Sequence, residues 1–352
     1  MAAKQTKTPK VGWVDAHVLC REFMTHGFNL LFTGPPGIGK TDLVKTVAKE
    51  LGYNLIIFHP VVSDPTDFKG LPNFVQLDNG DHEAVFIPFD QFKELLDAKG
   101  PTICFLDDLG QAAVAVQAAA MQLLHGGSLN AKKISPEVRF IACTNRKQDR
   151  AGVSGILEPV KSRFHGIFEL VPEIDPFVQW LINNGGSPVL VAFMRNRPEH
   201  LTGGPDGWSP DTDIVNQPCP RTIAHLNDII TLQLPRALRG TAYSGAVGEG
   251  MGNEYVAFES LALSIPDIDV ILKNPHGAQP PSTNEIAYAM VGALHTRMNR
   301  KNLANIFTYI DKHFVKELQA VFFLDIENYQ PSLMETPAYI NWAKNNGDLL
   351  TN

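Results

Sequence analysis

Short apolar runs alternate with helical patterns through the first half of the chain. Five of these runs have the length of a buried strand, at residues 27–33, 54–58, 102–106, 138–142 and 166–170. Between them, residues 41–51 and 112–124 carry apolar side chains at the spacing of an α-helix. Strands that are apolar along their whole length are typical of parallel sheets covered on both faces. The pattern therefore predicts an α/β fold, a three-layer sandwich with a parallel five-stranded sheet in the middle.

Two intervals depart from this alternation. Residues 74–88 contain an Asn-Gly turn between two strand-like runs, which is typical of a β-hairpin. Residues 126–135 form a shorter excursion before the strand that begins at Val138. We expect both intervals to project from the sheet as surface hairpins.

The second half of the chain has a different pattern. Beyond the prolines at 172–176 it is helical, and a glycine-rich stretch at 240–252 predicts a flexible connection before further amphipathic helices. We therefore expect three parts: a core over 1–172 that contains both hairpins, a small helical domain over 173–239, and a helical C-terminal region over 240–352.

Composition narrows the class of protein. The chain of 352 residues is 44% hydrophobic and 19% charged, as in ordinary globular proteins. Its formal net charge of −7 disfavours a broad nucleic-acid-binding surface, so nucleic acid is not expected as a partner. No apolar run has the length of a signal peptide core or a membrane span, and the four cysteines are too far apart for a zinc site. These features predict a cytoplasmic protein without a membrane span.

The connection between the first strand and the first helix carries a phosphate-binding motif. Residues 34–41 read GPPGIGKT and match G-x-x-x-x-G-K-[ST] at every position. The glycines let backbone N–H groups surround the phosphates, and the helix N-terminus adds a favourable potential. Lys40 is expected to reach the β- and γ-phosphates of ATP, and the Thr41 hydroxyl to bind Mg²⁺. The expected nucleotide-binding residues are Gly34, Pro35, Pro36, Gly37, Ile38, Gly39, Lys40, Thr41 and Asp42.

A second acidic motif follows the strand at 102–106. Asp107 and Asp108 end this apolar run in the manner of a Walker B segment. We expect Asp107 to hold Mg²⁺ through the water shell of the metal, and Asp108 to orient or deprotonate the attacking water. The alternative is that the two aspartates only begin a loop or cap the next helix.

Together these motifs resemble the AAA+ superfamily of P-loop NTPases, and in particular its MoxR branch. Residues 143–146 (CTNR) look like the sensor 1 element, in which Asn145 would position the attacking water. Residues 157–164 (LEPVKSRF) resemble the segment that carries the arginine finger, so Arg163 would reach the γ-phosphate held by a neighbouring subunit. Arg221 opens a later helix, as the sensor 2 arginine does in this family, and would close the lid on the nucleotide.

Each arginine also has a plainer interpretation. Arg163 could form a salt bridge with Glu158 or with the neighbourhood of Asp107, and Arg221 could simply lie at a helix start. Arg146 and Arg150 follow sensor 1 and could contact phosphate across a subunit boundary or pair with a nearby acid such as Asp149.

The resemblance carries further implications. The intervals at 74–88 and 126–135 would be the two hairpins that MoxR proteins insert into the core, and residues 173–239 would be the helical AAA+ lid. The family forms homo-oligomeric rings, usually hexamers, that remodel a client or adaptor protein, often one with a von Willebrand factor A domain. By this likeness the chain is expected to be a ring-shaped ATPase with a chaperone role.

One residue departs from the family pattern. Most members have Asp-Glu in Walker B, whereas Asp108 is one methylene shorter, and a misplacement of about 1 Å can cost on the order of 100-fold in rate. His59, at the end of the second strand, could assist or could be a structural residue. A slowly hydrolysing nucleotide switch is therefore one alternative function. The other is a nucleic-acid-dependent motor that uses Lys132 and Lys133 in the second hairpin.

Overall fold

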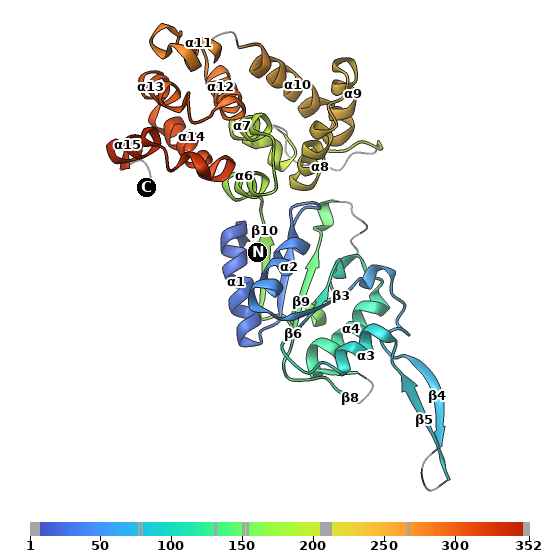
Figure 1. The fold of residues 1–352 in the computed structure, drawn as a ribbon. Helices are drawn as coiled ribbons and strands as arrows, with labels where there is room; N and C mark the ends of the chain where they lie inside the picture. Colours follow the sequence, from blue (N-terminus) through green and yellow to red (C-terminus); the bar gives the residue numbers. More distant parts are fainter. Residues whose placement is uncertain are drawn as a thin grey trace, which may run out of the picture. The chain divides into compact units, whose positions relative to one another are not determined.

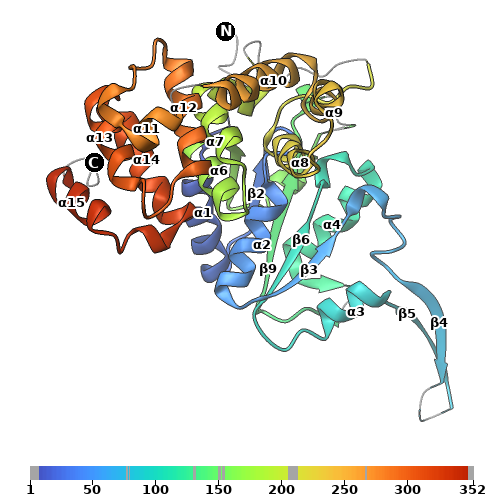
Figure 2. The same ribbon diagram turned by 45° about the horizontal axis from the view of Figure 1, so that its top comes forward.

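The computed structural model describes residues 8–347 apart from 77, 79, 130–131, 150–151, 153–154, 205–212 and 266–267. The chain divides into two compact units, Met1–Pro172 and Glu173–Asn352, which are described separately (Figures 1 and 2). No helix in the described ranges is long and apolar enough to cross a membrane.

The first unit is built on a parallel sheet of six strands in the order β1-β10-β2-β9-β6-β3. The strands are β1 (Lys10–Val11), β2 (Leu30–Thr33), β3 (Asn54–Phe58), β6 (Thr102–Leu106), β9 (Val138–Thr144) and β10 (Gly166–Leu170). The predicted α/β sandwich is confirmed, with one strand more than expected. The additional strand β1 has only two residues, one exposed and one half-buried, so it has no apolar run by which the sequence could reveal it.

Helices cover both faces of this sheet (Figure 2). The helices are α1 (Trp13–His26), α2 (Lys40–Leu51), α3 (Asp90–Leu96), α4 (Val114–Gly126) and α5 (Glu158–Lys161). Successive side chains of a strand point to opposite faces. Ile103 and Phe105 of β6 accordingly pack with α1 and α2, while Cys104 and Leu106 pack with α3 and α4. All four cysteines of the chain are buried and free.

Two hairpins interrupt the first unit. β4 (Leu71–Gln76) and β5 (His82–Ile87) form an antiparallel pair that extends away from the sheet (Figure 1). At its base Gly70 has a φ of +81°, and a β-carbon there would lie 2.1 Å from the Ile87 carbonyl oxygen. The second hairpin is short and joins β7 (Ser128–Leu129) to β8 (Lys132–Lys133), with residues 130 and 131 outside the described part.

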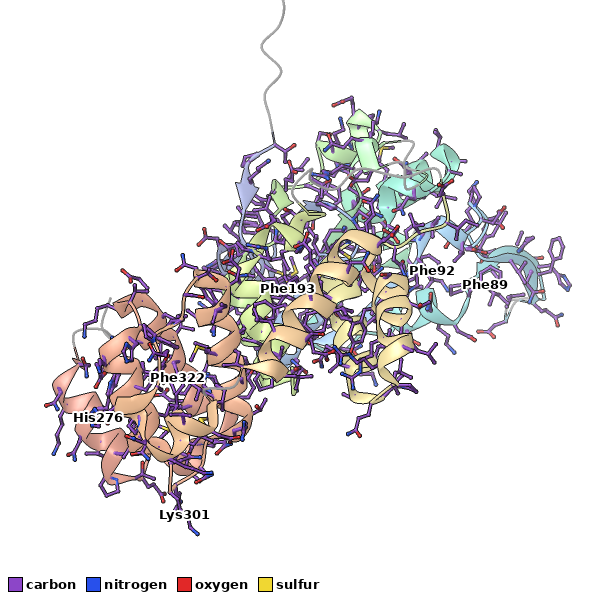
Figure 3. The ribbon with its side chains drawn as sticks, turned by 90° about the horizontal axis from the view of Figure 1, so that it is seen from above. Phe89, Phe92, Phe193, His276, Lys301 and Phe322 are labelled. Carbon is purple, nitrogen blue, oxygen red and sulfur yellow. The ribbon has the colours of Figure 1, made fainter. Side chains whose placement is uncertain are left out.

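The regular secondary structure of the second unit is helical in its described residues. Its α-helices are α6 (Ile174–Asn183), α7 (Pro188–Asn196), α8 (Pro220–Thr231), α9 (Arg236–Val247), α10 (Glu249–Ser264), α11 (Ile268–Lys273), α12 (Asn284–Arg297), α13 (Leu303–His313), α14 (Lys316–Tyr329) and α15 (Pro337–Asn345). One core lies around Phe193 of α7 and a second around Phe322 of α14 (Figure 3). The two cores share half-buried side chains, Ile265, Tyr288 and Tyr329 among them, so they form one continuous body.

The expectation of a flexible connection at 240–252 is wrong. These residues lie in α9 and at the start of α10, and the two helices pack closely. A β-carbon on Gly252 would come within 2.6 Å of the Ser244 Cα, so the glycine allows this close approach. Glycine at a tight helix–helix contact and glycine in a flexible loop look alike in a sequence.

Candidate functional site

The P-loop is the turn between β2 and α2. Gly39 precedes the helix with a φ of +94°, a left-handed conformation that only glycine adopts readily. At the other end of the turn, a β-carbon on Gly34 would lie 2.7 Å from both the Ile38 side chain and the Leu170 carbonyl oxygen. The backbone path therefore requires glycine at both positions. The first turn of α2 carries N–H groups that the helix itself does not satisfy, which suits it to bind an anion.

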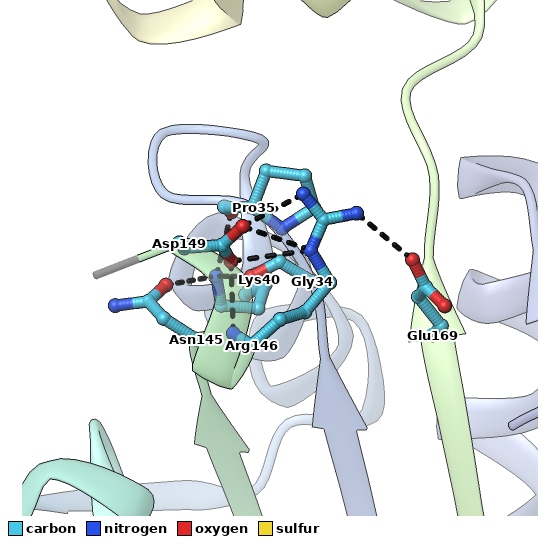
Figure 4. A network of polar contacts seen from close by, with 7 residues as sticks. All are labelled: Gly34, Pro35, Lys40, Asn145, Arg146, Asp149 and Glu169. Carbon is cyan, nitrogen blue, oxygen red and sulfur yellow. Dashed lines mark hydrogen bonds and ion pairs between the residues drawn. The ribbon is translucent and has the colours of Figure 1, made fainter. Parts of the chain in front are cut away.

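Lys40 lies at the centre of this turn and is only 7% exposed. Its ammonium group donates hydrogen bonds to the carbonyl oxygens of Gly34 at 3.0 Å and Pro35 at 2.8 Å. A third bond, of 2.7 Å, goes to Oδ1 of Asn145 at the end of β9 (Figure 4). Burial lowers the pKa of Lys40, and the neighbouring carboxylates of Asp107 and Asp108 oppose this shift. Lys40 of the P-loop and Asn145, the predicted sensor 1 residue, are thus in direct contact.

The acidic residues after β6 adjoin the same group. The Thr41 hydroxyl donates to Oδ2 of Asp107 at 2.8 Å, and Nδ2 of Asn145 donates to Oδ1 of Asp108 at 3.3 Å. Asp108 has a φ of +58°, which is uncommon for a residue other than glycine and often marks a functional position. β2, β6 and β9 are parallel neighbours, so their carboxyl ends bring Lys40, Thr41, Asp107, Asp108 and Asn145 together.

The donor atoms here suit Mg²⁺. A hydroxyl oxygen of Thr41 and a carboxylate oxygen of Asp107 lie side by side, and Mg²⁺ prefers oxygen ligands. The described residues contain no group of three His, Cys, Asp or Glu side chains that could hold a metal alone. Two adjacent protein oxygens can hold Mg²⁺ together with phosphate oxygens and water.

Arg146 is engaged within the chain. Its guanidinium pairs with Asp149, with Nη2 at 2.7 Å from Oδ1, and its Nη1 reaches Oε1 of Glu169 on β10 at 3.1 Å (Figure 4). Of the two interpretations left by the sequence, the structure contains the ion pair. Glu169 was not predicted, although it is the only charged residue in an otherwise apolar run. Arg150 lies outside the described residues.

Arg163 follows α5 in the first unit. Its Nη1 donates to the carbonyl oxygen of Pro159 and, at 3.3 Å, to the hydroxyl of Ser162. Its Nε is buried and has no hydrogen-bond partner among the described residues. Glu158 pairs with Lys161 at 2.5 Å, so the salt bridge considered for Arg163 is not formed.

The last two candidates lie elsewhere. Arg221 is exposed in the first turn of α8, in the second unit, and its position relative to the P-loop stays a prediction. Next to it, the Thr222 hydroxyl accepts the Cys219 N–H at 2.9 Å and so caps the helix. His59 is exposed at the end of β3.

Comparison with known proteins shows which family the first unit is similar to. Residues 30–171 match the model of the ATPase family associated with various cellular activities (AAA), a match over less than half of the chain. A segment of 64 residues is 44% identical to the cell cycle checkpoint protein RAD17 of Pongo abelii and of Homo sapiens, which is 17% of this chain and 9% of those proteins.

Solved structures show weaker likeness. A mutant of RuvB from Thermotoga maritima has a TM-score of 0.43 and 16% identity, covering 72% of this chain and 74% of that one. A second RuvB mutant from the same organism has a TM-score of 0.41 and 16% identity, covering 71% and 69%. Similarity at this level does not identify a function. The family match spans β2 to β10 and contains the P-loop, Asp107, Asp108 and Asn145. The first unit of the chain therefore has the α/β fold of P-loop NTPases, and its residues 30–171 are similar to an AAA ATPase domain.

Proposed function

We propose that the protein hydrolyses ATP as one subunit of a homo-oligomeric ring, and that it is a MoxR-type remodeller of a client or adaptor protein. The observation that carries this proposal is the hydrogen-bonded group formed by Lys40, Thr41, Asp107 and Asn145 at one edge of the sheet. The group combines a cation for phosphate, oxygen ligands for Mg²⁺ and a polar side chain that touches both Lys40 and Asp108.

Each residue has a role that follows from its contacts. Lys40 binds the β- and γ-phosphate oxygens when its ammonium exchanges carbonyl partners for phosphate. Thr41 and Asp107 hold Mg²⁺, which supplies charge neutralisation at the phosphates. Asp108 orients the attacking water or accepts its proton, and Asn145 holds Asp108 in place while it senses Lys40.

Arginines complete the site in the proposal. Arg163, whose side chain is only partly buried, reaches the γ-phosphate of a neighbouring subunit. Arg221 closes the helical lid, proposed over 173–239, on the nucleotide. A site that needs a second subunit couples hydrolysis to assembly, and a hexamer is the ring size usual in this family.

The β4–β5 hairpin is the proposed contact with the client. Its apolar side chains are unusually exposed, with Phe74 at 74% and Leu71 at 58%. Exposed apolar side chains on a projecting element are typical of protein–protein contact. A partner with a von Willebrand factor A domain is the class that the MoxR resemblance suggests.

The test is ATP turnover at increasing protein concentration. Turnover per subunit should rise as rings form, and Arg163→Ala should abolish the rise while ATP still binds. Because a trans-acting arginine contributes about 10³–10⁵ in rate, the loss should be unmistakable. Equal turnover by isolated monomers and by assemblies would contradict the proposal.

A nucleic-acid-dependent motor is the second candidate, favoured by the exposed Lys132 and Lys133 in β8. It predicts turnover that DNA or RNA stimulates, with a stimulation that salt removes steeply. Unchanged turnover with single- and double-stranded nucleic acid would exclude it.

A further inference from the structure

Gln117 belongs to α4, and its polar side chain points into the apolar core with an exposure of 0%. Its Nε2 donates to the carbonyl oxygens of Ala112 at 3.1 Å and Gly155 at 2.8 Å, and its Oε1 accepts the N–H of Leu157 at 3.1 Å. Both ends of the amide are therefore used. Gly155 and Leu157 are the neighbours of Ile156, so Gln117 is hydrogen-bonded to the backbone on both sides of that residue.

The backbone at residues 155–157, which Gln117 binds, is the start of the segment that carries Arg163. The Leu157 carbonyl oxygen accepts the N–H groups of Val160 and Lys161, so Leu157 is the residue on which α5 begins. Arg163 follows six residues after Leu157. Fixing the orientation of Leu157 thus fixes the direction in which this short helix leaves the core.

The far end of the segment is held as well. Nδ2 of Asn29 donates to the Arg163 carbonyl oxygen at 3.1 Å, and the Asn29 carbonyl oxygen accepts the His165 N–H at 2.8 Å. Between the two ends, Val160 and Phe164 are buried in the same core as α4. Two amide side chains therefore hold the backbone of the Arg163 segment against the domain.

The helix that bears Gln117 is in turn close to the hydrolytic site. A short 3₁₀ helix, Leu109–Gln111, leads from Asp108 towards α4, and the Gln111 N–H donates to the Asp108 carbonyl oxygen at 3.0 Å. A β-carbon on Gly110 would lie 2.2 Å from the Thr144 hydroxyl, so this turn packs against the end of β9 without room to spare. Asp108 and α4 are thus joined by a short, closely packed turn.

We infer that Gln117 is a positioning residue for Arg163: it sets the arginine of one subunit for the active site of its neighbour. The inference rests on the proposed function. An amide buried among apolar side chains costs stability unless both its ends are bonded, and an apolar residue would fill the same space without that cost. Gln117 instead uses two of its three bonds on the loop that leads to Arg163.

The test compares Gln117→Met with Gln122→Leu. Methionine has a similar length and removes all three bonds, while Gln122 is exposed on the same helix and serves as the matched control. Gln117→Met should bind ATP within about twofold of the parent, and its turnover should fall on the order of 100-fold, the cost of a misplacement of about 1 Å. Gln122→Leu should turn over normally.

Mixing separates positioning from damage to the fold. Lys40→Ala subunits cannot turn over ATP themselves, but they offer an intact Arg163 segment to a neighbouring Gln117→Met site. Turnover per Gln117→Met subunit should be at least about tenfold higher in mixed rings than in rings of Gln117→Met alone. Arg163→Ala subunits treated in the same way give the reference, and Gln117→Glu, which keeps the acceptor for Leu157, is a second variant with the same readouts.

Three outcomes would overturn the inference. The first is a Gln117→Met turnover within about twofold of the parent. The second is a loss that mixing does not restore although it restores Arg163→Ala. If Arg163→Ala itself turns over normally, the proposed function fails and the inference fails with it, so the two failures are distinguishable.

Discussion

In the first unit, the buried Lys40 ammonium lies among two carbonyl oxygens and the Asn145 amide. In the second unit, the Arg195 guanidinium on α7 binds both oxygens of the buried Asp325 carboxylate on α14, with Nη2 at 3.0 Å from Oδ1. The partners of Lys40 are neutral and can be exchanged for phosphate, whereas Arg195 has a full counter-charge of its own. The first arrangement suits ligand binding and the second suits a fixed contact between helices.

A second contrast concerns unsatisfied groups. His295 on α12 lies 3.8 Å from Asp325, and both of its ring nitrogens are buried without a hydrogen-bond partner among the described residues. The ring stacks on Phe322 at 4.2 Å between centroids. Burial lowers the pKa of His295 to about 3, so the ring is neutral at pH 7. The neutral His295 ring therefore bears on the stability of the second unit through its burial.

The largest effect should come from breaking the ion pair of the second unit. Arg195→Met leaves the Asp325 carboxylate buried without its partner, and removing one member of a buried pair typically costs 3–5 kcal/mol, so we expect a loss of about 4 kcal/mol in unfolding free energy. Denaturant unfolding measures this loss. ATP affinity should be unchanged where the fold persists. A loss below about 1 kcal/mol would show that the pair is not structurally important.

Lys40→Ala should have the opposite profile. ATP affinity should fall by at least about 100-fold, since charge-assisted hydrogen bonds contribute about 1.5–3 kcal/mol each. Stability of the unliganded chain should change little, because the hydrogen-bond partners of the ammonium are neutral and no carboxylate is bonded to it directly. Calorimetric titration with ATP, beside thermal unfolding, checks both statements, and an unfolded variant would remove the contrast between the units.

Asp108→Asn tests hydrolysis apart from binding. The amide cannot accept a proton from water, so turnover should fall on the order of 100-fold while ATP still binds, as expected for a lost general base. Single-turnover measurements on assembled rings are the appropriate readout. Unaltered turnover would transfer the role of base to another group, with the exposed His59 as the next to examine.

The smallest effect at neutral pH is a pH dependence of the second unit, which grows as the pH falls. The folded pKa of His295 lies below its unfolded value of about 6.5, so the unfolded chain takes up a proton first as the pH falls. Stability should then fall by up to about 1.4 kcal/mol for each pH unit between about 6.5 and 3. Burial raises the pKa of Asp325, an opposing effect at the acid end of this range. Denaturant titrations at a series of pH values give the unfolding free energy of the parent and of His295→Met as a function of pH. The slopes of these two pH dependences should differ, and equal slopes would contradict the low pKa assigned to His295.

Much of the first unit could be predicted from local pattern. An apolar strand needs only its own residues to be recognisable, and the P-loop motif is contiguous, so the β2–α2 connection and the acidic end of β6 were both foreseen. That Lys40, Asp107 and Asn145 meet also follows from parallel strands, whose carboxyl ends share an edge. The strand β1 was not predicted, because two residues are too few to show a hydrophobic pattern.

The sequence by itself determined the class of fold and the residues that chemistry requires at a phosphate site, because both depend on spacing along the chain. Only the tertiary structure decided which side-chain amide is hydrogen-bonded to Leu157 and which carboxylates form ion pairs with Arg146. It also decided that the glycines of 240–252 lie in packed helices. These contacts join residues far apart in the sequence. A glutamine in a helix has the same local pattern whether it faces solvent, as Gln122 does, or closes three hydrogen bonds in a core, as Gln117 does.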